Sequence, residues 1–237
     1  MIKISNVKVN GFEDAIRGMR NPMNSWHLSD SRYISNTDTY CAYEDVVEVG
    51  HYTSFVIGQK DKELMMKLCK AGPEHRKFMR MITVHLDINA PLYWWKEFDT
   101  YKVGTVANSC STMHKIHAKE FTLFDFSHEH LTIGSMSILA YIIDKLNERR
   151  NCYLNYDELS KKDYFATGIT KKDIWWDMIQ LLPSSYNQKR TVMMNYEVLA
   201  NIYKSRKGHR LDEWHKFREW VETLPCSDLI TEADSDE

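Results

Sequence analysis

The sequence has few of the residues that interrupt regular structure, with only 9 glycines and 5 prolines in 237 residues. A chain with so few breakers favours long helices and strands. It contains neither of the glycine-rich phosphate loops GxGxxG and GxxxxGK[ST], and it has no GxSxG nucleophile elbow. The nucleotide-binding folds that are built on those loops are therefore disfavoured.

The sequence also lacks an excess of charge of either sign and any long apolar segment. It has 31 Lys and Arg against 33 Asp and Glu, so it has no global cationic field for non-specific nucleic-acid binding. No apolar run approaches the roughly 20 residues that cross a bilayer, and the first residues lack the features of a secretory signal. We expect a cytoplasmic protein with neither a membrane nor a nucleic acid as partner.

Cysteine is not arranged for a metal or for disulfides. The five cysteines are widely spaced and form no CxxC pair, which favours reduced thiols over a disulfide framework or a structural zinc site. His114-x-x-His117 and His128-x-His130 each place two imidazoles near one another, but no HExxH motif or partnered cysteine set accompanies them. We predict no metal site.

Aromatic residues are what the sequence has in abundance, at 12% of the chain with 7 Trp and 13 Tyr. This content exceeds what one modest core requires. Because aromatic side chains are favoured in subunit contacts, it favours an oligomer.

Apolar periodicity predicts the secondary structure. Residues 1–10 and Met81–Asn89 alternate between apolar and polar residues as strands do, and the second segment does so strictly. Residues 21–45 have no steady period and are expected to form mostly a surface loop, with Glu44–Val49 and Tyr52–Ile57 as candidate strands. Helices are expected at Phe12–Met19, Asp61–Ala71, Leu92–Thr100, Ile133–Arg150, Ile174–Leu182, Val192–Lys207 and Asp212–Leu224.

These elements predict a helix-rich α+β fold in a single domain over residues 1–225. The acidic residues 226–237 are expected to form a disordered tail.

A cluster of basic residues stands where one predicted helix ends and the next begins. Such a corner could hold a phosphate by charge-assisted hydrogen bonds, or it could simply complement the dipole at a helix end. The cluster comprises Lys204, Arg206, Lys207, His209 and Arg210, with Arg218 two turns further on.

The order of the elements resembles the flavin-dependent thymidylate synthases. In that family a helix and a glycine-containing turn precede a strand, an Ala-Pro, an aromatic-rich helix and a polar loop that contacts flavin and deoxyuridylate. The resemblance covers residues 10 to 224 and extends to the late helices. The corresponding segments are Leu68–Gly72, Phe78–Asn89, Ala90–Phe98, Asp99–His114, Leu182–Tyr186, Asn195, Lys204–Arg206 and Trp214–Arg218.

The diagnostic residues of that family are replaced here. Its loop carries Arg-His-Arg, seven residues and then Ser, whereas this chain has Tyr101-Lys102-Val103, seven residues and Ser111, with Asn108 three before the serine as in the family. A family arginine at the start of the late helix corresponds to Glu197. Lys102 could restore one positive charge, but an ammonium cannot reproduce a bidentate guanidinium.

The resemblance implies a homotetramer with its sites between subunits. It implies that the chain binds FAD and transfers a one-carbon unit from a folate donor to C5 of a deoxyuridylate-type pyrimidine nucleotide. The roles that it implies are catalysis for Lys102 and Ser111, cofactor binding for Asn108, Lys204 and Arg206, and substrate binding for Ser111 and Arg218.

Two alternatives stay open on the sequence. The missing signature arginines favour a noncatalytic nucleotide-binding or sequestering protein on the same fold. An unrelated helical interaction protein is the third reading.

Overall fold

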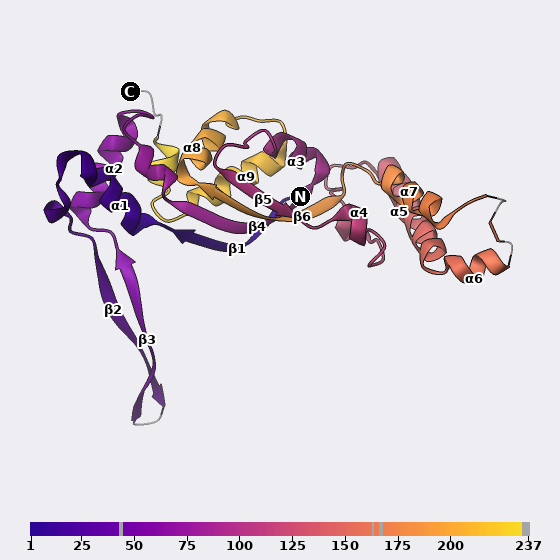
Figure 1. Cartoon of the computed structure of the whole chain (residues 1–237), viewed down its shortest axis with the longest axis horizontal. Coiled ribbons are helices and arrows are strands. Elements are labelled where there is room, and N and C mark those ends of the chain that lie inside the picture. Colours follow the sequence, from indigo (N-terminus) through magenta and orange to yellow (C-terminus); the bar gives the residue numbers. More distant parts are fainter. Residues whose placement is uncertain (43–44, 163, 166–167, 234–237) are drawn as a thin grey trace.

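The computed structural model describes residues 1–42, 45–162, 164–165 and 168–233, and from 36 to 52 it describes the backbone alone. A four-stranded antiparallel sheet in the order β1-β4-β6-β5 lies at the centre of an elongated molecule (Figure 1). Its strands are β1 (Lys3–Asn10), β4 (Thr83–Pro91), β5 (Thr105–Ser109) and β6 (Asn187–Asn195). In the part of the chain described, no helix is long and apolar enough to cross a membrane.

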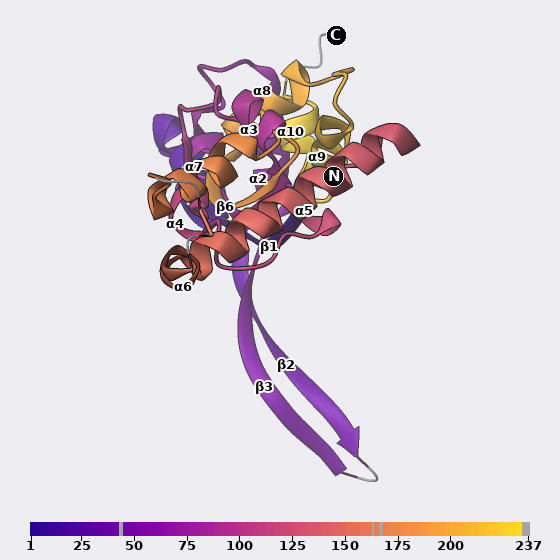
Figure 2. The same ribbon diagram turned by 90° about the vertical axis from the view of Figure 1, so that its right-hand side faces the viewer.

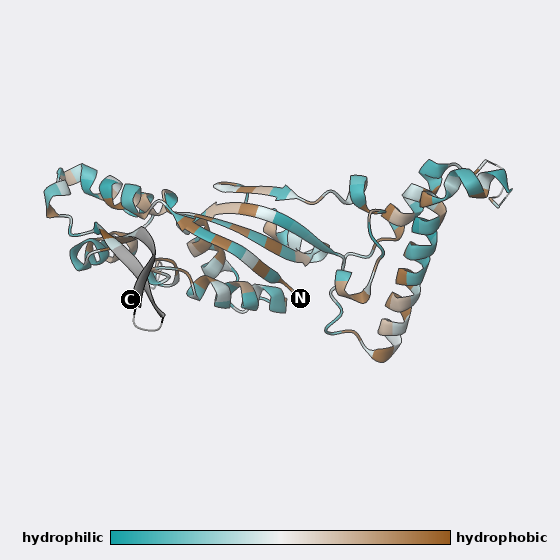
Figure 3. Cartoon of the chain, turned by 90° about the horizontal axis from the view of Figure 1, so that it is seen from below, coloured by the Kyte–Doolittle hydropathy of each residue, from teal (hydrophilic) through white to brown (hydrophobic). Residues whose placement is uncertain are grey.

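The two faces of this sheet differ, as the alternation in Met81–Asn89 predicts. Val84, Leu86 and Ile88 of β4 are buried against helices, whereas Asp87 and its cross-strand partners Ser5 and Thr191 point to the opposite face. In Figure 3, which looks at that opposite face, the strands are in view with the helices behind or beside them. The core helices are α1 (Phe12–Arg20), α2 (Gln59–Lys70), α3 (Leu92–Phe98), α8 (Tyr196–Ser205), α9 (Asp212–Glu222) and α10 (Asp228–Thr231).

Much of the aromatic content lies in this core rather than on the surface. Trp94 and Trp95 of α3 and Trp214 of α9 are fully buried, and the rings of Trp94 and Trp214 have centroids 4.7 Å apart. Each such aromatic pair contributes about 0.5 to 1.5 kcal/mol beyond the burial of area alone. The chain therefore uses a large part of its aromatic residues internally.

A second, smaller apolar cluster forms at the far end of the molecule (Figure 1). There α5 (Ile133–Leu154) packs on α7 (Lys171–Leu181) through Leu139, Leu146 and Met178. The long α5 runs across the front of this end in Figure 2. The short helices α4 (Thr112–Lys115) and α6 (Tyr156–Lys161) flank the pair.

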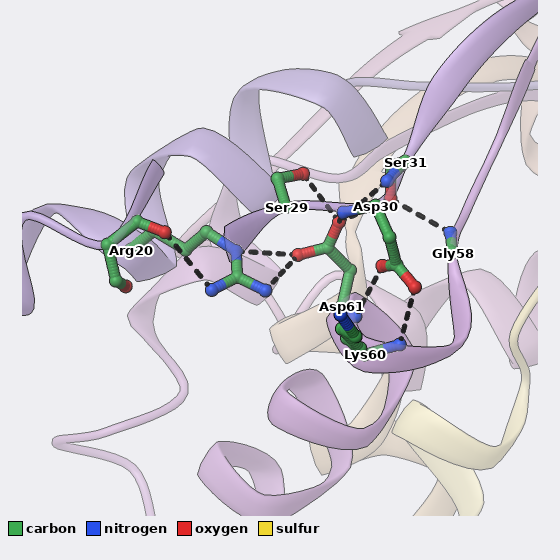
Figure 4. Close-up of polar contacts among 8 residues, drawn as sticks. Arg20, Ser29, Asp30, Ser31, Gly58, Lys60 and Asp61 are labelled. Atoms are coloured by element: carbon green, nitrogen blue, oxygen red, sulfur yellow. Dashed lines mark hydrogen bonds and ion pairs between the residues drawn. The ribbon is translucent and has the colours of Figure 1, made fainter. Parts of the chain in front are cut away.

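A two-stranded hairpin projects from the other end of the domain (Figures 1 and 2). It consists of β2 (Arg32–Ala42) and β3 (Asp45–Val56). Its base is fastened by the fully buried Asp61, which accepts hydrogen bonds of 2.6 Å from Arg20 Nε, Ser29 Oγ and Ser31 Oγ (Figure 4). Burial raises the pKa of Asp61, but these donors outweigh it and hold the pKa below its ordinary value.

The hairpin corrects the expectation of a surface loop over residues 21–45, since much of that segment pairs with β3. The two candidate strands Glu44–Val49 and Tyr52–Ile57 fall in the single strand β3, which ends at Val56, one residue before Ile57. Glu44 lies outside the described residues. Ladder hydrogen bonds between two strands stabilise a polar segment that has no clear period of its own.

Two other expectations are wrong. The segment Val192–Lys207 is not one helix, because its first part completes the central strand β6 and α8 begins only at Tyr196, capped by Asn195. The tail from 226 is not disordered as far as residue 233. It forms α10, and Leu229 and Ile230 are buried in the core, while residues 234–237 lie outside the described part.

Candidate functional site: the Ser111 cavity

Ser111 begins α4 directly after the edge strand β5. Its backbone is extended, with φ −71° and ψ 113°, and its Oγ accepts a hydrogen bond of 3.1 Å from the backbone N–H of His114. Serine is a preferred residue at this position because it satisfies an N–H that the first helical turn leaves unpaired. The polar run Gly104–Ser111 therefore folds as a short strand and a capped turn.

A cavity of about 520 Å³ adjoins Ser111, a volume within the range of small-molecule sites. Residues from β1, β4, β6, α4 and the turn Leu123–Asp125 line it. We call it the Ser111 cavity. Its charged and amide-bearing side chains include Lys3, Asp87, Lys115, Lys119, Asp125, Asn187 and Lys189.

Cations outnumber carboxylates in the Ser111 cavity, with four lysines against two aspartates. Lys189 Nζ lies 2.8 Å from Asp87, and Lys119 pairs with Asp125. Lys3 and Lys115 have no ion pair among the residues described. The cavity therefore carries an excess of positive charge suited to an anion.

The two aspartates are held in their ionised form. The hydrogen bond from Lys189, followed by those from Thr191 and Asn6, lowers the pKa of Asp87 to about 2. For Asp125, burial raises the pKa, but Lys119 and the Thr122 backbone and hydroxyl outweigh it, so the pKa is lowered. Each carboxylate is thus hydrogen-bonded to its own partners, which do not include Lys3 or Lys115.

One residue that lines the Ser111 cavity has an unpaired acceptor. Asn187 Oδ1 is buried and has no hydrogen-bond partner among the described residues. A buried amide oxygen without a donor is costly, so such an atom indicates a missing partner. A ligand that carries an N–H or O–H group could supply it.

The basic cluster predicted from the sequence differs from the Ser111 cavity, because one carboxylate lies among its basic side chains and contacts more than one of them. Glu97 of α3 lies within it and accepts hydrogen bonds of 2.9 Å from both Arg206 Nη1 and Trp214 Nε1. His209 Nε2 lies 3.1 Å from the same carboxylate, and Arg206 Nε donates to the Tyr101 hydroxyl at 2.8 Å. We call these five residues the Glu97 corner. Because Glu97 neutralises it, Arg206 would have to exchange this partner to bind a phosphate.

The other predicted site residues near the Glu97 corner are more open. Lys102 is exposed and lines a separate cavity of about 310 Å³ with Tyr101 and Thr105. Lys204 is exposed in the last turn of α8. Arg218 lies over the ring of Tyr203 at 4.1 Å and donates from Nε to the Tyr203 carbonyl at 3.0 Å.

The predicted site residues are therefore not gathered in one place within a protomer. Ser111 lines its cavity, and Asn108 stands next to Thr191 on the same sheet face as Asp87. Lys102 and Arg206 lie beyond the other end of β5, a strand that spans roughly 17 Å. The roles that the resemblance implies for these residues stay predictions.

Sequence reasoning missed the lysines and Asn187 of the Ser111 cavity. They come from β1, α4, the segment before the Leu123–Asp125 turn, and β6, and no spacing connects them. The ion pair of Glu197 could not be predicted from the sequence either. Its partner Arg76 is 121 positions away and donates from Nε to the Glu197 carboxylate at 3.0 Å. The only available signal was that each residue is polar on a sheet face or at a helix end.

The fold is similar to that of solved thymidylate synthase ThyX structures. Two crystal structures of thymidylate synthase ThyX from Helicobacter pylori, both with FAD and dUMP, match with TM-scores of 0.61 and 0.60. They cover 100% and 98% of this chain and 100% of their own, at 13% and 14% identity. No family model and no curated protein sequence matches. The likeness confirms the predicted single-domain α+β fold.

Proposed function

We propose that this chain is a flavin-dependent thymidylate synthase-like enzyme. It binds FAD and a deoxyuridylate-type pyrimidine nucleotide and transfers a one-carbon unit from a folate donor to C5 of the pyrimidine, as a homotetramer. The observation that carries the proposal is the Ser111 cavity, where a serine at the family's spacing faces an excess of lysines. The full-length likeness to a ThyX crystallised with FAD and dUMP supports it.

The Ser111 cavity has complementary groups for a pyrimidine nucleotide. Lys3 and Lys115 offer charge-assisted hydrogen bonds to a phosphate. Asn187 Oδ1 offers an acceptor for the N3–H of a uracil ring, and Ser111 Oγ offers a further polar contact. In this proposal the chain's own residues bind and orient the nucleotide and stabilise its negative charge.

The flavin needs more than one protomer. The residues that the resemblance assigns to FAD, Asn108, Lys204 and Arg206, lie at separate places in one chain. Their polar and cationic character fits a diphosphate, provided that neighbouring copies bring them together. When bound, reduced flavin supplies the hydride and takes part in methylene transfer.

A noncatalytic nucleotide-binding or sequestering protein is the second candidate. The observation that favours it is the Glu97 corner, where Arg206 is engaged by Glu97 and Tyr101. The signature arginines are replaced by a phenol and an isopropyl group, Tyr101 and Val103. Since removing one preorganised donor lowers a rate roughly a hundredfold to a thousandfold, binding should survive better than catalysis.

The test combines binding with turnover on the full chain. The absorption spectrum of the purified protein reports flavin, calorimetry reports deoxyuridylate affinity, and tritium release from labelled deoxyuridylate reports turnover with flavin, folate donor and reductant. Ser111→Ala should weaken nucleotide binding, whereas Ser160→Ala, at an exposed serine of α6, is the matched control. Binding with turnover supports the enzyme, binding alone supports the second candidate, and absence of both rejects each.

A further inference from the structure

A second cavity, separate from the Ser111 cavity, lies between α4, α5 and α7. It has a volume of about 400 Å³. The proposed function uses none of its residues. Its lining consists of Met113, His114, His117, Tyr153, Lys171, Lys172 and Trp175.

The walls of this cavity are fastened to one another across three elements. Trp175 Nε1 of α7 donates to the Met113 carbonyl at 3.0 Å, and Arg150 Nε of α5 donates to the His117 carbonyl at 2.9 Å. The rings of His117 and Tyr153 have centroids 4.6 Å apart. The cavity is therefore a preformed feature rather than a gap between loose side chains.

The lining is basic and aromatic, without a carboxylate. Lys171 Nζ is held 5.0 Å from the centroid of the Tyr153 ring, an orientation that cation–π attraction favours. Neither Lys171 nor Lys172 has an ion pair within the described part of the chain. The nearest acid in sequence, Asp173, accepts hydrogen bonds from the Thr170 N–H and hydroxyl.

One residue of the lining has an unpaired ring nitrogen as well. His117 Nδ1 is buried and has no hydrogen-bond partner among the described residues. Two lysines and two imidazoles beside flat aromatic rings match the hydrogen-bonding needs of a phosphate group carried by a planar molecule. We propose that this cavity is a second anion site, which binds a phosphate-bearing ligand through Lys171, Lys172 and His117.

The experiment follows the ring nitrogens of ¹⁵N-labelled histidine in the full chain during titration with inorganic pyrophosphate. The His117 signals, assigned by their loss in His117→Phe, should shift in the wild type. Lys171→Gln/Lys172→Gln should weaken this response at least tenfold. The control Lys60→Gln/Lys67→Gln removes the same charge from exposed sites on α2, at the opposite end of the molecule (Figure 1), and should leave it unchanged.

Two outcomes would overturn the proposal. The first is pyrophosphate binding that leaves the His117 signals unshifted. The second is an equal weakening of the His117 response in both double variants, because that would show only an effect of net charge. A parallel titration with adenosine monophosphate distinguishes free phosphate groups from phosphates carried by a planar molecule. Tighter binding than that of pyrophosphate would show that the ligand's ring packs on Trp175. Lys115→Gln removes a charge from the Ser111 cavity and none from the second cavity. Unchanged deoxyuridylate affinity in this variant, together with a retained His117 shift, would therefore reject the proposed function and keep this site.

Discussion

The Ser111 cavity and the Glu97 corner both gather basic side chains at one place on the domain, yet their electrostatics differ. In the Ser111 cavity the two aspartates are paired with Lys189 and Lys119, and further lysines remain. In the Glu97 corner a single carboxylate accepts from Arg206 and Trp214 and lies within reach of His209. A cluster of cations therefore becomes an anion site only where some of its cations are left without a carboxylate partner.

Removal of Arg206 should have the largest effect on stability. Arg206→Met keeps a flexible apolar side chain near Trp214 but leaves Glu97 without its guanidinium partner. We expect the free energy of unfolding to fall by about 1.5 to 3 kcal/mol, the range for a hydrogen bond to a charged group. Urea denaturation measures it. Lys207→Met, at an exposed neighbour, is the control, and equal losses for the two variants would contradict a structural role of the corner.

Removal of Lys115 should act on binding instead. Lys115→Gln lowers the positive charge of the Ser111 cavity without breaking an ion pair among the described residues. We expect deoxyuridylate affinity to fall about tenfold, with the free energy of unfolding changed by less than about 0.5 kcal/mol. Calorimetry and urea denaturation of the same samples test both parts, with Lys67→Gln on α2 as the control. Unchanged affinity would show that the cavity is not the nucleotide site.

Neutralising Glu97 should make the two regions more alike. Glu97→Gln leaves Arg206 and His209 without their carboxylate, so the corner should gain a weak anion site. We expect pyrophosphate titration to show additional binding, with an affinity gain below about tenfold because the corner stays accessible to solvent. Glu63→Gln, which removes an exposed carboxylate from α2, should not produce it. A titration identical to that of the wild type would contradict the claim that Glu97 prevents this corner from binding anions.

The smallest effect concerns pH. The pKa of Asp87 is about 2 in the folded chain, below the ordinary value near 4 in an unfolded one. Its contribution to stability is therefore present above about pH 4 and is lost as the pH falls toward 2. Asp87→Asn should make the free energy of unfolding less dependent on pH in that window. Asp157→Asn in α6 serves as the control, and an unchanged slope for Asp87→Asn would argue against the ion pair with Lys189.

The strands and helices with a clear period could be predicted from the sequence, and those that depend on distant partners could not. The alternation from Ile82 to Ile88 is a property of the segment itself, so β4 was identified. Val192 and Met194 face the core as part of β6, but valine and methionine before Tyr196 also fit a helix, and only pairing with β4 decides between them. The burial of Leu229 and Ile230 likewise could not be predicted from their own segment, because it depends on contacts with the distant helices α8 and α2.

The candidate site was predictable only where spacing carried it. Ser111 and Asn108 follow from the polar loop of the resembling family, and the structure places both on or beside β5. The basic corner was visible as a run from Lys204 to Arg210, but Glu97, more than a hundred residues earlier, was not a visible partner. Local sequence shows charges, whereas their compensation is set by the tertiary fold.

The strand β1 contains a register shift between Ser5 and Lys8, where Asn6 has a φ of 54° and donates to Asp87 at 2.7 Å. A bulge of this kind bends an edge strand and interrupts its row of free N–H and C=O groups. The other edge, β5, has only five residues. Another chain cannot easily extend this sheet through either border, so the bulge protects the protein from aggregation by strand addition while leaving the broad polar face open to solvent.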